Sequence, residues 1–344
     1  MTNNRRKTLA MFAVIVTALG CASRSQTGGT SEPPLPAAPD SIVEMPVTLA
    51  TPGGNVFGTL ELPASRYPVP VALIIAGSGP TDRNGNSPAL PGANNSLKLL
   101  ARGLAEHGIA SLRYDKRGIA ASRQASTREQ DVRFTHFIED AEGWLAQLRA
   151  DRRFSTVAVV GHSEGSLIGM VAAREAGADA YVSLEGAGRK PLELISEQLS
   201  GQLPPETVAQ ARAVMATMEA GNLPDSSVHI PPILASLFRP SVQPYLVSWL
   251  KYDPAVEIAK LRIPILIVQG TTDIQVGMKD ADTLAAAQPA GKLVVIEGMN
   301  HVLKTAPPGR AEQMATYSDP TLPVVPRLLG ELAGFIHGAR KKAR

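Results

Sequence analysis

The sequence has 344 residues, of which 44% are hydrophobic and 19% charged, a balance typical of a globular chain with one large domain or two small ones. This composition excludes a disordered or collagen-like chain. The net charge is +3, but three of the 34 basic residues lie among the first 20, and the remaining 31 match the 31 acidic residues. We therefore expect no nucleic-acid partner, because such binding needs a basic surface.

The first 20 residues have the features of a signal peptide. A basic start is followed by an apolar run, Leu9–Leu19, that is too short to span a bilayer. Ala18-Leu19-Gly20 then leads to Cys21 and resembles a bacterial lipobox, with Ala18 where leucine is usual. We expect a periplasmic lipoprotein anchored to a membrane through lipidated Cys21. Cleavage without lipidation, giving a soluble periplasmic or secreted protein, and twin-arginine export are the alternatives.

Residues 21–40 are rich in Ser, Thr, Gly, Pro and Ala, which predicts a flexible tether. The last residues, 339–344, form a basic tail that we expect to be solvated. Cys21 is the only cysteine and the six histidines are scattered, so the sequence predicts no disulfide, metal site or cofactor. It leaves the oligomeric state open.

From residue 41 onward, short β-branched apolar runs alternate with helical stretches. The predicted strands are Val56–Leu62, Val69–Ala76, Ala110–Tyr114, Thr156–Val160, Ala180–Leu184, Ile265–Gln269 and Leu293–Glu297. The predicted helices are Ser96–His107, Phe134–Ala150, Leu167–Ala176, Lys279–Ala287 and Pro326–His337. This order predicts an α/β fold over 41–187 and 255–338. Its central sheet is mostly parallel, with helices on both faces and one or two antiparallel strands at the edge.

Residues 188–254 interrupt this alternation with helical segments and no convincing strand, which predicts a helical cap inserted above the sheet. The expected segments are Pro191–Gly201, Pro205–Ala220, a piece near Ile230–Phe238, and Val242–Tyr252. Apolar cap residues are candidates to line a substrate cavity, although ordinary packing produces the same spacing. They are Met215, Met218, Leu237, Phe238, Tyr245 and Trp249.

The most informative motif is Gly161-His162-Ser163-Glu164-Gly165, which lies between a predicted strand and a predicted helix. This is the context of a nucleophile elbow, a strained turn that exposes the serine hydroxyl. Glycines on either side leave room for neighbouring chain and for substrate. We predict Ser163 as the nucleophile; a glycine-rich turn with a passive serine is the alternative.

A serine nucleophile needs a histidine base and an acid that orients it. Asp273 follows the strand Ile265–Gln269, and His301 follows the strand Leu293–Glu297. Parallel strands bring their carboxyl ends to one edge of the sheet, so we expect both residues to meet Ser163 there. Taken singly, Asp273 has an alternative role as a helix cap, and His301 as a loop histidine bound to backbone.

Other titratable residues are weaker candidates. Asp253 is expected to end the cap, Asp280 and Asp282 fall on a helix, and His162 is expected to pack inside the elbow. Glu185, directly after the strand Ala180–Leu184, lies at the active edge. It is either near the substrate or a buried acid bonded to loop backbone.

Acyl transfer also needs hydrogen-bond donors for an oxyanion. The strand Val69–Ala76 runs into Gly77-Ser78-Gly79-Pro80-Thr81-Asp82-Arg83-Asn84-Gly85-Asn86. We expect the backbone N–H of Ser78, or of Gly79 as the alternative, to act with that of Glu164. A simple surface turn is the other interpretation of this loop. Its charged and amide residues, Asp82, Arg83 and Asn84, are expected to brace the loop or to touch substrate.

These motifs, with Tyr114-Asp115-Lys116-Arg117-Gly118 and Asn300-His301, resemble the α/β-hydrolases, and within them the bacterial serine-aminopeptidase-like carboxylesterases. The resemblance spans about Val43 to His337. It implies the α/β-hydrolase fold, Ser163 as nucleophile, Asp273 as acid, His301 as base, and Ser78 with Glu164 as oxyanion donors. The family commonly has a second glycine after Tyr-Asp-Lys-Arg-Gly, where this chain has Ile119-Ala120-Ala121-Ser122; we expect that loop to be stiffer.

The resemblance implies a serine carboxylesterase that cleaves short to medium acyl esters through an acyl-enzyme, with a small-molecule ester as its partner. A peptidase or amidase uses the same three residues, as does a thioesterase, lactone hydrolase or β-lactam hydrolase. A binding protein that has kept the fold without the chemistry is disfavoured, because all three positions are filled.

Overall fold

The computed structural model describes residues 41–339, except 66–67, 91, 127 and 226. The predicted signal peptide, the predicted lipidation site Cys21, the predicted tether and nearly all of the basic tail lie outside the described residues. No helix within the described ranges is both long and apolar enough to cross a membrane.

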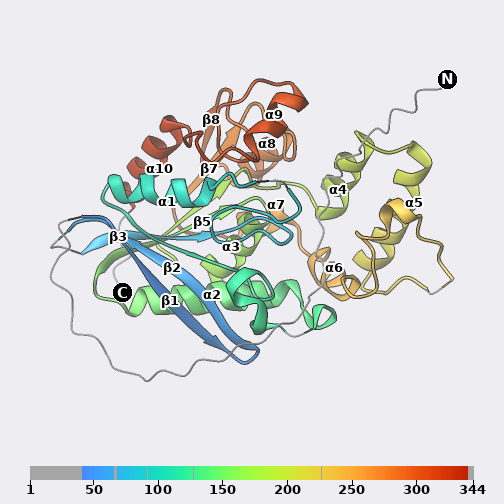
Figure 1. Cartoon of the computed structure of the whole chain (residues 1–344), viewed down its shortest axis with the longest axis horizontal. Coiled ribbons are helices and arrows are strands. Elements are labelled where there is room, and N and C mark those ends of the chain that lie inside the picture. Colours follow the sequence, from blue (N-terminus) through green and yellow to red (C-terminus); the bar gives the residue numbers. More distant parts are fainter. Residues whose placement is uncertain (1–40, 66–67, 91, 127, 226, 340–344) are drawn as a thin grey trace.

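A central eight-stranded sheet organises the described chain (Figure 1). Its spatial order is β1-β2-β4-β3-β5-β6-β7-β8. In chain order the strands are β1 Val43–Thr51, β2 Gly54–Leu62, β3 Val69–Ile75, β4 Ala110–Tyr114, β5 Phe154–His162, β6 Ala180–Leu184, β7 Ile265–Gly270 and β8 Lys292–Ile296. β1 pairs antiparallel with β2, and β2 with β4, whereas all other neighbours are parallel.

The predicted fold class is confirmed. All seven predicted strands are present within two residues of their expected ends, and the antiparallel edge is made by β1 and β2. β1 was missing from the predicted strands.

The helices are α1 Ser96–Glu106, α2 Phe134–Ala150, α3 Glu164–Glu175, α4 Pro191–Ser200, α5 Pro205–Glu219, α6 Gln243–Trp249, α7 Pro254–Ala259, α8 Met278–Ala287, α9 Arg310–Thr316 and α10 Pro326–Gly338. The short helices α7 and α9 were also missing from the prediction.

Alternate residues of the parallel strands face two separate cores. Along β3, Val71, Leu73 and Ile75 pack in one core, and Ala72 and Ile74 in the other. The first core contains side chains of α2, α3, α7 and α8, and the second those of α1 and α10. A parallel sheet covered on both faces needs this nearly continuous apolar sequence, since each face must be buried.

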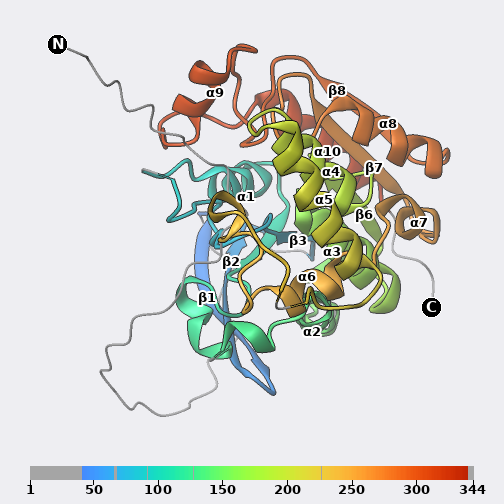
Figure 2. The same cartoon turned by 90° about the vertical axis from the view of Figure 1, so that its right-hand side faces the viewer.

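The insertion between β6 and α7 holds α4, α5, a short 3₁₀ turn Pro232–Leu234, and α6. Figure 2 faces this insertion, with α4 and α5 in front of the core. Most of the apolar residues proposed to line a cavity instead pack within the first core: Met215, Met218, Leu237, Phe238 and Tyr245. Of the six candidates, only Trp249 lines the cavity described below. For the other five, the expectation was wrong because helices in an insertion bury apolar faces against one another and against the core.

The segment after Tyr-Asp-Lys-Arg-Gly turns through Ala120, whose φ is 42°. This value lies in the left-handed region, which costs an L-residue with a side chain roughly 1–2 kcal/mol. The position therefore has the backbone that glycine favours, although the residue is alanine. The turn is held by Ser122, whose hydroxyl accepts a hydrogen bond from the Phe57 N–H at 2.8 Å.

Candidate active site

Ser163 lies at the sharp turn between β5 and α3. Its φ of 55° and ψ of −122° confirm the strained backbone predicted for an elbow. A Cβ added at Gly161 would lie 2.3 Å from the Gly165 carbonyl oxygen, and one at Gly165 would lie 2.2 Å from that of Ile75. Both positions thus exclude any larger residue, and the turn can pack against β3 only because it has these glycines.

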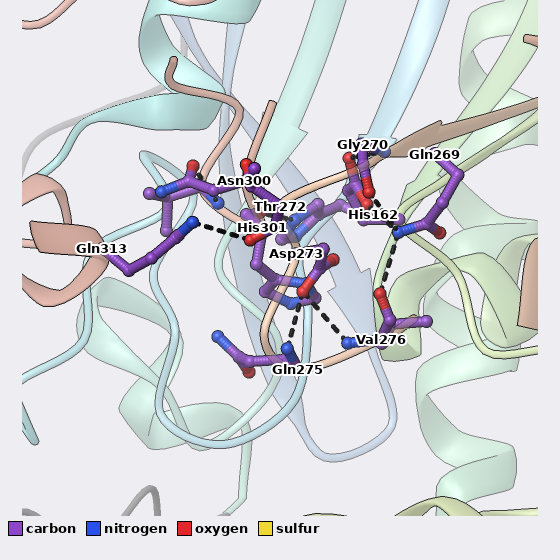
Figure 3. A network of polar contacts seen from close by, with 12 residues as sticks. His162, Gln269, Gly270, Thr272, Asp273, Gln275, Val276, Asn300, His301 and Gln313 are labelled. Atoms are coloured by element: carbon purple, nitrogen blue, oxygen red, sulfur yellow. Dashed lines mark hydrogen bonds and ion pairs between the residues drawn. The ribbon is translucent and has the colours of Figure 1, made fainter. Parts of the chain in front are cut away.

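Asp273 and His301 are joined by a hydrogen bond of 2.7 Å between Asp273 Oδ2 and His301 Nδ1 (Figure 3). The other carboxylate oxygen accepts hydrogen bonds from the N–H groups of Gln275 and Val276 at 2.7 and 3.0 Å. Helix α8 begins later and is preceded by Gly277, so Asp273 does not cap it. The loop after β7 therefore fixes the carboxylate, which in turn fixes one tautomer and orientation of the imidazole.

The loop that carries His301 is held by buried side chains. Asn300 accepts from the N–H groups of Val302 and Lys304, and donates to Thr316 Oγ1 at 2.7 Å. His162 Nε2 lies 2.8 Å from the His301 carbonyl oxygen, and the two rings are 4.8 Å apart. Burial lowers the pKa of His162 to about 3, so the ring is neutral and donates this hydrogen bond. His162 thus supports the backbone of His301.

Ser163, Asp273 and His301 line one cavity of about 360 Å³. The loop after β3 contributes Ser78 and Gly79. The insertion contributes Leu194, Ile195 and Gln198 of α4, Gln202 just after α4, and Trp249 of α6. Among the hydrogen bonds of the described residues, none joins Ser163 Oγ to the His301 ring, a contact that in unliganded sites is often long. A hydroxyl, an imidazole and a carboxylate therefore line the same partly apolar cavity.

Glu185 does not line this cavity, although it lies at the same edge of the sheet. It is fully buried, accepts the Gly270 N–H at 2.9 Å and the Gln269 amide at 2.5 Å, and hydrogen-bonds Asp273. Burial, together with the negative charge of Asp273, raises the pKa of Glu185 well above its ordinary value. Burial acts in the same direction on Asp273, but the neighbouring His301 and the hydrogen bond from Glu185 outweigh it and lower the pKa of Asp273. Glu185 therefore carries the proton and Asp273 the charge.

The loop after β3 approaches Ser163 closely. A Cβ added at Gly77 would lie 3.0 Å from Ser163 Cβ and 3.5 Å from Ser163 Oγ. Glu164, the first residue of α3, presents a backbone N–H that has no acceptor within the helix. The two backbone segments expected to bind an oxyanion thus flank the serine.

Three polar residues of this loop do not line the cavity. Asp82 accepts from the N–H groups of Asn84 and Asn86, and Arg83 pairs with Asp115 at 2.7 Å. The Asn84 carbonyl accepts from Leu97 N–H at the start of α1. None of Asp82, Arg83 and Asn84 lines the cavity, so in this structure they brace the loop.

Three structural contributors escaped the sequence reasoning. Lys116 contacts both Gly77 and Glu164, Tyr245 donates to the Glu164 carboxylate, and Asp280 binds the start of the insertion through Gly188 and Arg189. Lys116 lies in the motif Tyr114-Asp115-Lys116-Arg117-Gly118, yet no sequence signal showed where its ammonium points.

Asp253 accepts from Ala255 N–H at 3.0 Å as the cap of α7, which fits its expected place at the end of the insertion. Within the described residues, no group of three His, Cys, Asp or Glu side chains could hold a metal ion.

The eight-stranded sheet and the turn at Ser163 have the arrangement of the α/β-hydrolase fold. A family model described as "Serine aminopeptidase, S33" matches residues 93–194. The chain is 27% identical over 270 residues to Esterase EstD of Thermotoga maritima, covering 77% of this chain and 61% of the relative. The chain thus spans less than two thirds of that relative's length.

Solved structures share the fold at low sequence identity. Est1E from Butyrivibrio proteoclasticus superposes with a TM-score of 0.54 at 17% identity, covering 85% of this chain and 98% of that one. Proline iminopeptidase of Mycobacterium smegmatis gives a TM-score of 0.53 at 16% identity, with the same coverage. Est1E and a proline iminopeptidase therefore share this fold with the chain about equally, and the fold alone does not identify the activity.

Proposed function

We propose that this protein is a serine carboxylesterase that cleaves short to medium acyl esters. The observation that carries the proposal is the 2.7 Å bond between Asp273 and His301 in the cavity that Ser163 also lines. The similarity to an esterase over most of the chain supports the same reaction.

In the proposed mechanism, His301 Nε2 accepts the proton as Ser163 Oγ attacks the ester carbonyl carbon. Asp273 holds the imidazole and stabilises its positive charge. The N–H groups of Ser78 and Glu164 bind the oxyanion of the tetrahedral intermediate. The alcohol leaves with the proton from His301, and water then attacks the acyl-enzyme by the same route, releasing the acid.

The charges of the cavity favour an ester over a free amino terminus. An aminopeptidase would need an anionic group to bind the substrate ammonium. The carboxylates that line the cavity are Glu164, Glu197 and Asp273, and each has a cationic or imidazole partner: Lys116, Arg189 and His301 respectively. None of the three is left to recognise an ammonium group.

The test is hydrolysis of p-nitrophenyl esters from acetyl to decanoyl, with an aminoacyl arylamide in parallel and Ser163→Ala as control. We expect ester turnover that falls by at least about 10³-fold in the variant, because the nucleophile is lost. Preferred cleavage of the arylamide would point to a peptidase. Ester turnover unchanged in Ser163→Ala would refute the assignment.

We also propose that the protein is exported and anchored through Cys21. The basic and apolar start of the sequence and its lipobox-like residues support this proposal. Membrane fractionation of cells expressing the full chain and a Cys21→Ala variant tests it. Wild-type protein in the membrane fraction and the variant in the soluble periplasm is the expected result. Both in the cytoplasm would contradict export, and both in the periplasm would contradict lipidation.

A further inference from the structure

The ammonium of Lys116 is buried next to the backbone that flanks Ser163. Its side chain is 2% exposed, and Nζ donates to the Gly77 carbonyl oxygen at 2.6 Å and to Glu164 Oε2 at 2.9 Å. Nζ also lies 5.0 Å from the centre of the Phe137 ring. Burying an ammonium costs several kcal/mol unless partners compensate, and here two oxygens and an aromatic face do so.

The contact with Gly77 orients a peptide group that the proposed reaction uses. The Gly77 carbonyl and the Ser78 N–H belong to the same peptide, which is planar and trans, so the two bonds point in opposite directions. When Lys116 holds the carbonyl oxygen on one side, the N–H is directed to the other. A cation bound to the carbonyl also polarises the peptide and strengthens its N–H as a donor.

The contact with Glu164 fixes the second peptide. Glu164 is the first residue of α3, and its side chain is 3% exposed. Lys116 holds one carboxylate oxygen, and the Tyr245 hydroxyl of α6 donates to the other. The residue that offers its N–H beside Ser163 is therefore held by its own side chain, and one ammonium connects both backbone segments.

We propose that Lys116 is a positioning residue for the oxyanion hole, aligning the N–H groups of Ser78 and Glu164. This inference rests on the proposed serine hydrolase function. Lys116 does not line the cavity, and its hydrogen bonds go to Gly77 and Glu164. It acts in the transition state through the two peptides, so its loss lowers kcat more than it changes KM.

A purely structural role is the competing explanation, and the neighbouring residue supplies the matched control. Arg117 forms a buried ion pair with Asp140 of α2, and neither of these residues lines the cavity. The double variant Arg117→Met/Asp140→Asn removes a comparable buried ion pair, of which Arg117 belongs to the same motif as Lys116. We expect it to lower stability without changing kcat per active site.

The test compares Lys116→Met and Lys116→Met/Glu164→Gln with wild type and with this control, in the full chain. The double variant leaves no unpaired charge buried, so it keeps the test valid if the single variant does not fold. Active sites are counted by complete labelling with a fluorophosphonate, and ester kinetics are normalised to that count. We expect kcat to fall about 10- to 100-fold with KM within about threefold, since removal of one oxyanion donor costs about 10²–10³.

A trifluoromethyl ketone provides the second measurement, because its adduct with Ser163 carries an oxyanion. We expect its affinity to fall by the same factor as kcat in both Lys116 variants and to be unchanged in the control. Normal kcat in the folded Lys116 variants, or equal losses in the control, would overturn the inference. Absence of ester hydrolysis by wild type would instead overturn the proposed function.

Discussion

At the scale of single residues, Ser163 places the proposed nucleophile on a strained backbone. Its φ of 55° and ψ of −122° lie where a residue with a side chain pays about 1–3 kcal/mol. The flanking glycines and the packing of the turn against β3 hold this conformation. Stability is thus given up locally so that the hydroxyl faces the cavity.

Replacing Ser163 with glycine should release this strain. Ser163→Gly is expected to be about 1 kcal/mol more stable than Ser163→Ala. The strain energy that glycine removes is larger than the roughly 0.5–1 kcal/mol that glycine costs by making the unfolded chain more flexible. Urea unfolding of the two variants measures the difference. Equal stability, or a more stable alanine variant, would show that the turn is not strained.

The protonation of Glu185 should make the stability of the protein depend on pH. Its folded pKa lies well above its ordinary value of 4.5, so above that pH the unfolded chain loses a proton that the folded chain keeps. Wild-type stability should therefore fall as pH rises from 4.5 toward the folded pKa, by up to about 1.4 kcal/mol per pH unit.

The side chain of the variant Glu185→Gln does not titrate, so its stability should not show this fall with rising pH. The free energy of unfolding, measured by urea at intervals from pH 5 to pH 8, is expected to decline in wild type relative to the variant. Parallel pH profiles would mean that Glu185 is ionised in the folded protein. Residual ester hydrolysis serves as the check that the variant is folded.

At the scale of the elements, a buried carboxylate is one of the groups that attach the insertion to the core. Asp280 of α8 is fully buried and accepts from the N–H groups of Gly188 and Arg189 and from the Arg189 guanidinium at 2.7 Å. This contact lies where the chain leaves β6 for α4. It joins two elements that are about 90 residues apart in sequence.

Removing this carboxylate should cost far more than removing an exposed one from the same helix. Asp280→Ala is expected to lower the free energy of unfolding by about 3 kcal/mol, because it leaves a buried guanidinium without its main partner. The exposed neighbour Asp282→Ala is expected to change it by less than about 0.5 kcal/mol. Chemical denaturation of both variants measures the two free energies of unfolding. Similar decreases in the two variants would contradict the anchoring role of Asp280.

At the scale of the whole molecule, the cavity exists only because distant segments meet. Its wall combines the loop after β3, the elbow, α4, Trp249 and the loops after β7 and β8. The sheet edge supplies the polar floor, and the insertion supplies apolar side chains such as Leu194 and Ile195. The proposed acyl-chain preference is therefore a property of this assembly and of no single element.

A larger side chain at Leu194 should shorten the preferred acyl chain. In wild type we expect kcat/KM to rise by up to about fourfold per methylene while each added methylene is buried, from about 0.8 kcal/mol each. In Leu194→Phe the increase in kcat/KM should stop at a shorter acyl chain than in wild type. Leu199→Phe lies on the same helix but does not line the cavity, and it should leave the profile unchanged. Identical profiles for all three proteins would exclude α4 from the acyl site.

The sequence by itself determined those features of the protein that depend on the local pattern of apolar, polar and glycine residues. Apolar runs separated by amphipathic helices predicted the α/β order, and the motif around Ser163 predicted the strained turn. The neighbourhood of Asp273 and His301 was also predictable, because parallel strands bring their carboxyl ends to one edge.

Only the tertiary structure decided which side chains share a buried space. Lys116 and Glu185 are ordinary charged residues in sequence, and their roles depend on oxygens and amides that other segments bring to them. Helical spacing likewise could not separate Trp249, which lines the cavity, from Met215 and Phe238, which pack in the core. Periodicity reports that a face is apolar. What that face meets depends on long-range packing, which local sequence does not encode.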